Sequence, residues 1–234
     1  MQPRDGSPPV ADNSDARFEF RCWARNFGMV ETRIRRFSEC HGIRESNEIY
    51  VVSLANNDTN IKIRDDDLEL KSLIKKQDNL EQWYPRTNRV FPLTAATLEE
   101  ELFPPCKVAM PSLSLESYSL HQFLKEIVLP HEELSAVAVF KRRFAFTVND
   151  CMTELAEVWI NGAGLHTVAV ESTDPAAVSE TRSMLGLDDL ENVNYLRAIK
   201  RVIGMEPRRN HLSASGTTNR VRILPPLEFR IWLA

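Results

Sequence analysis

Hydrophobic and polar residues alternate along several short segments of the chain, which is the pattern of half-buried β-strands. In residues 17–24, Phe18 and Phe20 alternate with Glu19 and Arg21. Similar strand patterns follow in two groups, residues 47–55, 60–64 and 68–74, and then residues 134–148, 153–160 and 166–172. Short turns such as Asp65–Asp67 separate the strands of each group, so the sequence predicts two antiparallel meanders.

Helical spacing of apolar residues appears between these strands. Residues 27–39 predict an amphipathic helix, Asp174 and Pro175 begin a second one that stops at Gly186, and residues 194–203 form a third. Shorter helices are predicted at residues 97–103 and between Ser119 and Pro130, and residues 83–93 could include an edge strand. At least six strands in two meanders, with helices between them, predict an α+β fold whose antiparallel sheet is large enough to curl into a barrel.

The two ends of the chain differ from the middle. Residues 1–16 are rich in Pro, Ser, Asp and Asn, which predicts a disordered N-terminal segment. Residues 206–234 show no sustained period, although RVRIL and LEFRIWL could be strands. The sequence therefore predicts one folded domain over residues 17–205, with a C-terminal extension of uncertain structure after it.

Composition is typical of a soluble globular protein, since 43% of the 234 residues are hydrophobic and 26% are charged. The net charge of −4 predicts no general attraction to nucleic acid or to an anionic membrane. The tryptophans do not alternate with basic residues as in a platform for stacked bases, so a nucleic-acid partner is not expected. Four scattered cysteines without a CxxC pair, together with the lack of a signal peptide or an apolar run that could span a bilayer, predict a cytoplasmic protein.

Glycine is scarce, with eight residues in the whole chain. Their spacing excludes a dinucleotide fingerprint and a P-loop, because both motifs need glycines at fixed intervals. If the protein binds phosphate, side chains must therefore contact it rather than a glycine-rich backbone loop.

Basic residues recur on one face of the predicted strands. They are Arg21, Lys62, Arg64, Lys71, Lys141 and Arg143. One interpretation is the solvent face of a sheet that helices cover on its other side. The other is the lining of a barrel, which the aromatic and aliphatic opposite faces favour, as does the small number of acidic residues expected beside the cations. Such a lining would require water and a polyanion, because unpaired buried charges are very unfavourable.

The order of several motifs resembles that of the CYTH-like, or triphosphate tunnel metalloenzyme, superfamily. The matching segments are NIKIRDDDLELK, VFKRRFAF, TVAVESTDPAAV, LGL and NVNYLRAIKRVIG, and the resemblance covers residues 17–204. It implies an antiparallel eight-stranded tunnel that holds triphosphate or polyphosphate with inward Lys and Arg side chains. It also implies carboxylates that bind Mg²⁺ or Mn²⁺.

The resemblance assigns roles to residues of this chain. Phosphate contacts are implied for Arg21, Lys62, Arg64, Lys71, Lys141 and Arg143. Glu19 and Glu171 are the implied catalytic carboxylates and metal ligands, with help from Glu154 or Glu157, which lie three residues apart and cannot share a strand face without a bulge.

Two carboxylates of the family pattern are replaced in this sequence. The family's opening Glu-x-Glu-x-Lys is here Arg17-Phe-Glu19-Phe-Arg21, and its late Glu-x-Glu is Ala169-Val-Glu171. Both replacements remove a possible metal ligand, whereas they make the tunnel less negative and so leave anion binding intact.

Three functions follow as hypotheses. The first is a metal-dependent hydrolase of inorganic triphosphate, polyphosphate or a nucleoside triphosphate. The second is a non-catalytic module that binds polyphosphate or another polyanion through the same basic residues. The third is an adenylate cyclase, for which no adenine pocket is evident. The sequence leaves the oligomeric state open.

Overall fold

The computed structural model describes residues 16–206. The predicted disordered segment therefore lies outside the described residues except for Ala16, whose side chain is buried. The predicted C-terminal extension lies outside them except for Glu206.

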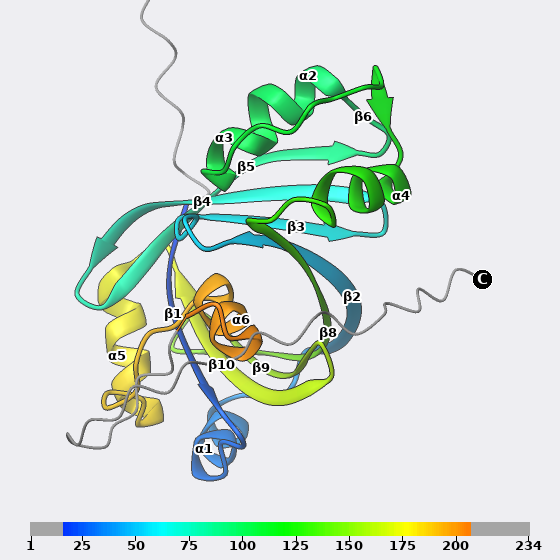
Figure 1. Cartoon of the computed structure of the whole chain (residues 1–234). Helices are drawn as coiled ribbons and strands as arrows, with labels where there is room; N and C mark the ends of the chain where they lie inside the picture. Colours follow the sequence, from blue (N-terminus) through cyan, green and yellow to red (C-terminus); the bar gives the residue numbers. More distant parts are fainter. Residues whose placement is uncertain (1–15, 207–234) are drawn as a thin grey trace, which may run out of the picture.

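Eight strands form a closed antiparallel barrel, which confirms the predicted fold class (Figure 1). They are β1 (Arg17–Ala24), β2 (Gly42–Ser53), β3 (Thr59–Arg64), β4 (Asp67–Gln77), β5 (Leu80–Val90), β8 (Leu134–Val148), β9 (Cys151–Ile160) and β10 (Ala163–Ser172). Around the barrel the order is β1-β10-β9-β8-β2-β3-β4-β5. The two predicted meanders are thus joined by the pairing of β2 with β8.

Strand β5 closes the barrel, although the sequence predicted only a possible edge strand in this region. It pairs with β4 along its length and with β1 through the partners Arg17 and Trp83. Shifts in the β4–β5 register follow Leu70 and Leu73, which interrupts the simple two-residue period. The tight turns before and after β4 place Asp65, Asp66, Asp78 and Asn79 at positive φ, a conformation that Asp and Asn tolerate better than most residues.

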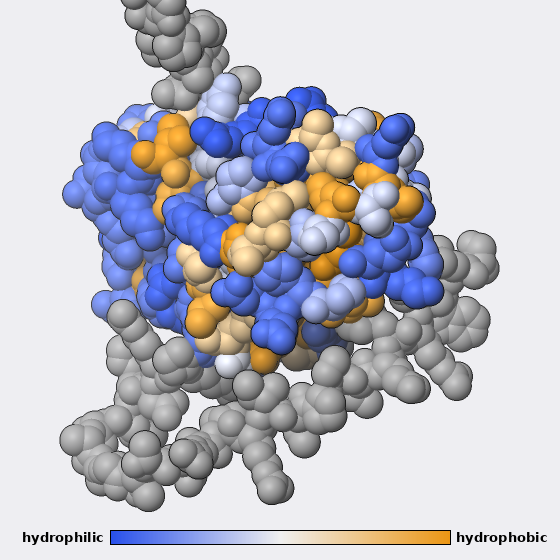
Figure 2. Space-filling model, turned by 45° about the horizontal axis from the view of Figure 1, so that its top comes forward, coloured by the Kyte–Doolittle hydropathy of each residue, from blue (hydrophilic) through white to orange (hydrophobic). Residues whose placement is uncertain are grey.

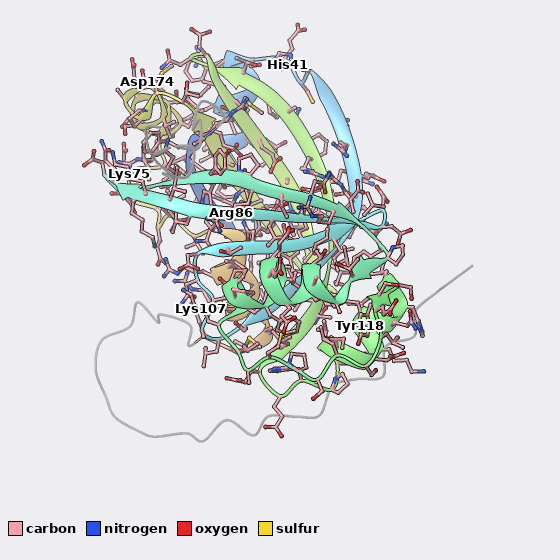
Figure 3. All side chains as sticks on the ribbon, turned by 90° about the horizontal axis from the view of Figure 1, so that it is seen from above. His41, Lys75, Arg86, Lys107, Tyr118 and Asp174 are labelled. Atoms are coloured by element: carbon pink, nitrogen blue, oxygen red, sulfur yellow. The ribbon has the colours of Figure 1, made fainter. Side chains whose placement is uncertain are left out.

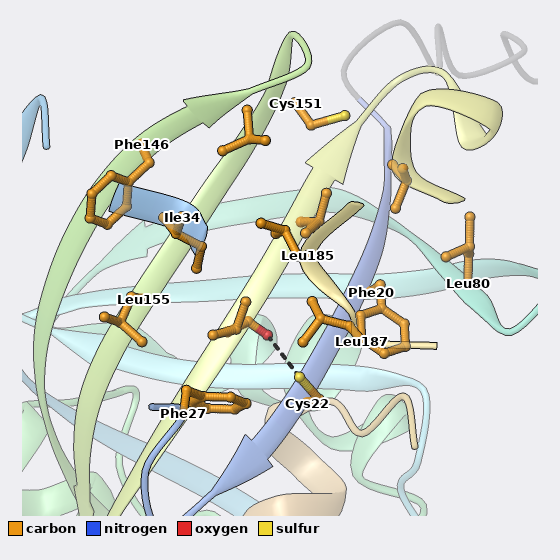
Figure 4. Packing of buried hydrophobic residues seen from close by; sticks show 14 of the residues in the cluster. Phe20, Cys22, Phe27, Ile34, Leu80, Phe146, Cys151, Leu155, Leu185 and Leu187 are labelled. Carbon is orange, nitrogen blue, oxygen red and sulfur yellow. Dashed lines mark hydrogen bonds between the residues drawn. The ribbon is translucent and has the colours of Figure 1, made fainter. Parts of the chain in front are cut away.

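Two helices, α1 (Met29–Phe37) and α5 (Pro175–Leu185), cover the outer side of β1 and β8–β10. Figure 4 shows the buried cluster between these helices and the strands, which includes Phe20, Ile34 and Leu185. The Asp174 side chain caps α5 by accepting a hydrogen bond from the backbone N–H of Ala176. The apolar faces of the alternating strands are therefore turned outward against helices, which leaves their charged faces for the interior.

The segment between β5 and β8 covers another part of the outer surface of the barrel. It contains β6 (Leu93–Thr94), α2 (Ala95–Thr97), the π-helical η2 (Leu98–Leu102), α3 (Phe103–Cys106), β7 (Ser117–Tyr118), α4 (Leu120–Gln122) and the π-helical η3 (Phe123–Val128). Its apolar side chains pack on the outer faces of β2, β3 and β4 in a cluster that includes Ile61 and Ile63. Seen from this side, the surface is mostly hydrophilic with scattered hydrophobic residues (Figure 2).

Helix α6 (Tyr195–Ile203) lies inside the ring of strands (Figure 1). Its apolar face packs against Tyr50, Trp83 and the inward valines of β8 and β9, which fills this end of the barrel. Lys200 anchors the helix, because its fully buried ammonium donates hydrogen bonds to the carbonyls of Leu54 and Asn56. The remaining, polar part of the interior forms the candidate site.

In the described part of the chain, no helix has the length and apolar character needed to cross a membrane.

Candidate functional site

The polar part of the barrel interior encloses a cavity of about 510 Å³. Six basic side chains line it, and they are Arg21, Lys62, Lys71, Arg86, Lys141 and Arg143. Four acidic side chains also line it, and they are Glu19, Glu69, Glu154 and Glu171. The volume lies within the range of small-molecule sites, and the lining is far more charged than is usual for them.

The alternation of each strand explains why these side chains meet. Lys141 and Arg143 are two residues apart on β8, so both point into the barrel while Phe140 and Phe144 point out. Five of the six basic residues that the sequence singled out line the cavity. The sixth, Arg64, lies beside it and contacts Glu69 at 2.6 Å and Glu48 at 3.9 Å.

Glu48 on β2 is a buried counter-ion for one wall of the cavity. Its side chain has no exposed surface and lies 2.6 Å from the Lys141 ammonium and 3.5 Å from the Arg143 guanidinium. Ser46 donates a hydrogen bond to the same carboxylate, while Lys141 also donates one to the Tyr50 hydroxyl at 2.8 Å. Glu48 thus neutralises part of the positive charge that β8 brings into the barrel.

Burial and neighbouring charge act in opposite directions on this pair. Burial raises the pKa of Glu48, but the attraction of Lys141 and Lys62 outweighs it and holds this pKa at about 2. Burial lowers the pKa of Lys141 to about 7, even though Glu48 favours the protonated amine. The carboxylate is therefore charged at neutral pH, and the charge on the lysine is sensitive to what else enters the cavity.

Arg21 lies among three carboxylates on the opposite wall. Its Nε is 2.5 Å from Glu19, and its two terminal nitrogens are 3.1 Å from Glu154 and 3.7 Å from Glu171. The register explains the convergence, because β1 pairs with β10 and β10 with β9, with Glu19 directly opposite Glu171. The guanidinium carbon also lies 4.7 Å from the centre of the Tyr195 ring, where a cation–π contact is favourable.

Two of the carboxylates around Arg21, Glu171 and Glu19, have pKa values that are shifted in opposite directions. Burial and the adjacent charge of Glu19 together raise the pKa of Glu171 to about 7. For Glu19, burial also acts upward, but Arg21 and Lys71 outweigh it and lower the pKa below its usual value. Arg21 supplies one positive charge against three acidic groups and so cannot neutralise all of them. Near neutral pH, a proton on Glu171 can remove part of the remaining negative charge.

Two expectations from the sequence require correction. Glu157 does not join the other carboxylates, since it lies on the opposite face of β9 and pairs with Arg142 at 3.4 Å. The expected shortage of acidic residues beside the cations is also wrong, because Glu48 and Glu154 point inward as well. Neither Glu48 nor Arg86 stood out in the sequence: Glu48 lies between the polar half of β2 and its apolar run Ile49–Val52, and Arg86 follows Pro85 where β5 is irregular.

A divalent metal in this barrel would need the three carboxylates. Their oxygens are the ligand type that Mg²⁺ and Mn²⁺ prefer. However, the point on which they converge is filled by the guanidinium of Arg21, whose nitrogens already contact all three. Within residues 16–206, no group of three or more His, Cys, Asp and Glu side chains has the arrangement of a metal site. The residues present therefore do not fit the metal that the resemblance implies.

Comparisons with known proteins find similarity in structure alone. No protein-family model matches the sequence, and no curated protein matches it. Among solved structures, a conserved hypothetical protein from Pyrococcus furiosus is 16% identical with a TM-score of 0.48, and the match covers 77% of this chain and 98% of that chain.

Two further similar structures have stated activities. HpAC1 from Hippeastrum, an adenylyl cyclase candidate with a dominant triphosphatase activity, is 12% identical with a TM-score of 0.46 over 80% of this chain and 96% of that chain. The Pct1 RNA triphosphatase of Schizosaccharomyces pombe is 8% identical with a TM-score of 0.28 over 81% of this chain and 82% of that chain. At such identities and TM-scores these structures carry no activity over to this chain.

Proposed function

We propose that the barrel binds a triphosphate-class anion, which is inorganic triphosphate, polyphosphate or the triphosphate group of a nucleotide. The observation that carries this proposal is the cavity itself, because six basic side chains from β1, β3, β4, β5 and β8 line it. Guanidinium groups suit bidentate contacts with phosphate oxygens, and lysine ammonium groups act as mobile point charges.

The distribution of ion pairs supports an anion on the side of β4 and β5. Within residues 16–206, neither Lys71 nor Arg86 forms an ion pair with a carboxylate within 4.0 Å, although both line the cavity. Figure 3 shows Arg86 near the middle of this wall, and Lys75 toward the tip of the β4–β5 hairpin. Tyr195 adds a buried hydroxyl that has no hydrogen-bond partner among the described residues and can donate to an anionic oxygen. These groups are ready to contact a ligand without first losing a partner.

The test is calorimetric titration of the full chain with inorganic tripolyphosphate. Lys71→Ala removes one charge-assisted contact, so we expect affinity to fall by roughly 10- to 150-fold, as for a loss of about 1.5–3 kcal/mol. Lys75→Ala is the matched control, because Lys75 is an exposed lysine on the same strand and does not line the cavity. Equal affinities of the two variants, or no binding by the unmodified chain, would reject the proposed site.

A hydrolase is the second candidate function, and the position of Glu154 and Glu171 favours it. Both carboxylates line the same cavity as the basic residues, so they could accept a proton from a water that attacks a bound phosphate. Release of inorganic phosphate from tripolyphosphate, lost in Glu171→Gln with binding retained, would establish it. Binding without release would instead identify a non-catalytic polyanion-binding module. No observation on the described residues favours an adenylate cyclase.

A further inference from the structure

Arg21 occupies the centre of the carboxylate wall as a permanent part of the fold. Only 4% of the residue is exposed. Its backbone N–H donates to the Asn192 side chain at 2.9 Å, and Thr167 accepts a long hydrogen bond from the guanidinium at 3.5 Å. Tyr195 covers one face of the guanidinium. The side chain therefore has contacts on several sides besides the carboxylates.

All three nitrogens of the Arg21 guanidinium face acidic partners. Nε contacts Glu19, and the terminal nitrogens contact Glu154 and Glu171. A divalent cation that used the same oxygens would have to displace the guanidinium, which would leave a buried positive charge without a partner. Such a charge is strongly unfavourable. The cation would also have to approach the positive guanidinium, and the two charges would repel each other.

We propose that Arg21 takes the place of a divalent metal, so that the barrel binds its triphosphate-class anion free of metal. This inference rests on the proposed function for the identity of the ligand. The guanidinium neutralises part of the wall formed by Glu19, Glu154 and Glu171, a task that a bridging cation would otherwise perform. The anion is then held by basic side chains on the other strands.

The other walls of the cavity carry enough positive charge to hold the anion. Five basic side chains line them, against the lining carboxylate Glu69 and the buried Glu48 behind Lys141 and Arg143. The basic side chains are Lys62, Lys71, Arg86, Lys141 and Arg143. A Mg²⁺ complex of triphosphate carries two fewer negative charges than the free anion. It would therefore be attracted less strongly to these side chains, and it would meet Arg21 where its metal should be coordinated.

The first experiment measures Mn²⁺ alone by electron paramagnetic resonance, which reports binding as a loss of the free-ion signal. The unmodified chain is expected to leave the signal unchanged at micromolar Mn²⁺. Arg21→Ala is expected to reduce it, because the variant has three carboxylates around a vacated space. Arg86→Ala is the matched control, since it removes one arginine from the same cavity but not from among these carboxylates, and it should not gain Mn²⁺ binding.

Mn²⁺ binding by the unmodified chain as tight as that by Arg21→Ala would overturn the inference. The same conclusion would follow if Arg21→Ala folds, as judged by circular dichroism, and gains no Mn²⁺ binding.

The second experiment needs no variant and so holds even if Arg21→Ala fails to fold. Calorimetry compares tripolyphosphate binding to the unmodified chain in EDTA and in excess Mg²⁺. The expected result is binding in EDTA that becomes weaker, by tenfold or more, when Mg²⁺ is added. Binding only in Mg²⁺ would overturn the inference while leaving the proposed function in place. No binding under either condition would instead reject the proposed function, and the Mn²⁺ measurement would still decide the role of Arg21.

Discussion

Replacing Glu48 with glutamine tests whether the buried carboxylate balances the charge of the cavity. The substitution keeps the shape of the side chain and removes its negative charge. In the folded protein, Glu48 lies 2.6 Å from Lys141, and neither side chain is more than 4% exposed. Removing one partner of a buried pair typically costs about 3–5 kcal/mol.

Two features of the site place the expected loss near the lower end of that range. The glutamine carbonyl can still accept from Lys141, while its NH₂ group takes the place of the other oxygen and can donate to the Ser46 hydroxyl, which reverses that one hydrogen bond. In addition, the pKa of Lys141 is already about 7, so the lysine can lose its proton at neutral pH when its counter-ion is gone. We therefore expect a loss of about 3 kcal/mol, and a melting temperature roughly 6–12 °C lower for a domain of this size.

The assay is urea unfolding at pH 7, followed by circular dichroism, with Glu45→Gln as the matched control. Glu45 lies on the same strand and pairs with Arg142 at 2.6 Å, but this pair is on the exposed outer face. Solvent screens such a pair, so the control should unfold like the unmodified chain. Tripolyphosphate should stabilise Glu48→Gln more than the unmodified chain, because the anion replaces the missing counter-ion. Equal stability of the two variants would refute the charge balance inferred for the cavity.

Two further predictions concern lysines in the barrel interior. Burial lowers the pKa of Lys141 from 10.5 to about 7, so between these pH values the unfolded chain binds more protons than the folded one, and the contribution of this residue to stability rises with pH. The unfolding free energy of the unmodified chain minus that of Lys141→Met should therefore rise from pH 7 to pH 10. A difference that stays constant over this range would contradict the lowered pKa of Lys141. Lys200→Met should destabilise the protein by about 1–3 kcal/mol in urea unfolding, because the carbonyls of Leu54 and of the buried Asn56 lose their donor. An unchanged midpoint would mean that this lysine does not anchor α6.

Much of the fold follows from patterns a few residues long. The two-residue period of β8 predicted that Lys141 and Arg143 share a face, because neighbouring side chains of any strand point to opposite sides. Asp174 and Pro175 predicted the start of α5, since both residue types favour the beginning of a helix. Irregular segments were harder to predict. β5 contains Pro85 and pairs across register shifts, so no period marks it as the strand that closes the barrel.

The contents of the site depended on contacts that no local pattern contains. Glu48 is separated from Lys141 by more than ninety residues, and their ion pair exists because β2 pairs with β8 in one register. Arg21 meets Glu154 for the same reason, through the order of β1, β10 and β9. A shift of one residue in either register would turn one partner to the outer face. The sequence therefore predicted which basic residues share the charged strand faces, but it did not predict how far their charge is neutralised.

The sequence by itself determined most of the strands, the main covering helices and five of the six basic residues that line the cavity, because these depend on the spacing of apolar, polar and charged side chains along the chain. Only the tertiary structure decided that the charged faces turn inward and that Glu48 and Arg86 join them. It also placed Arg21 where the resemblance implied a metal. The physical reason is that an ion pair depends on distances of a few ångströms between side chains, and strand pairing sets those distances.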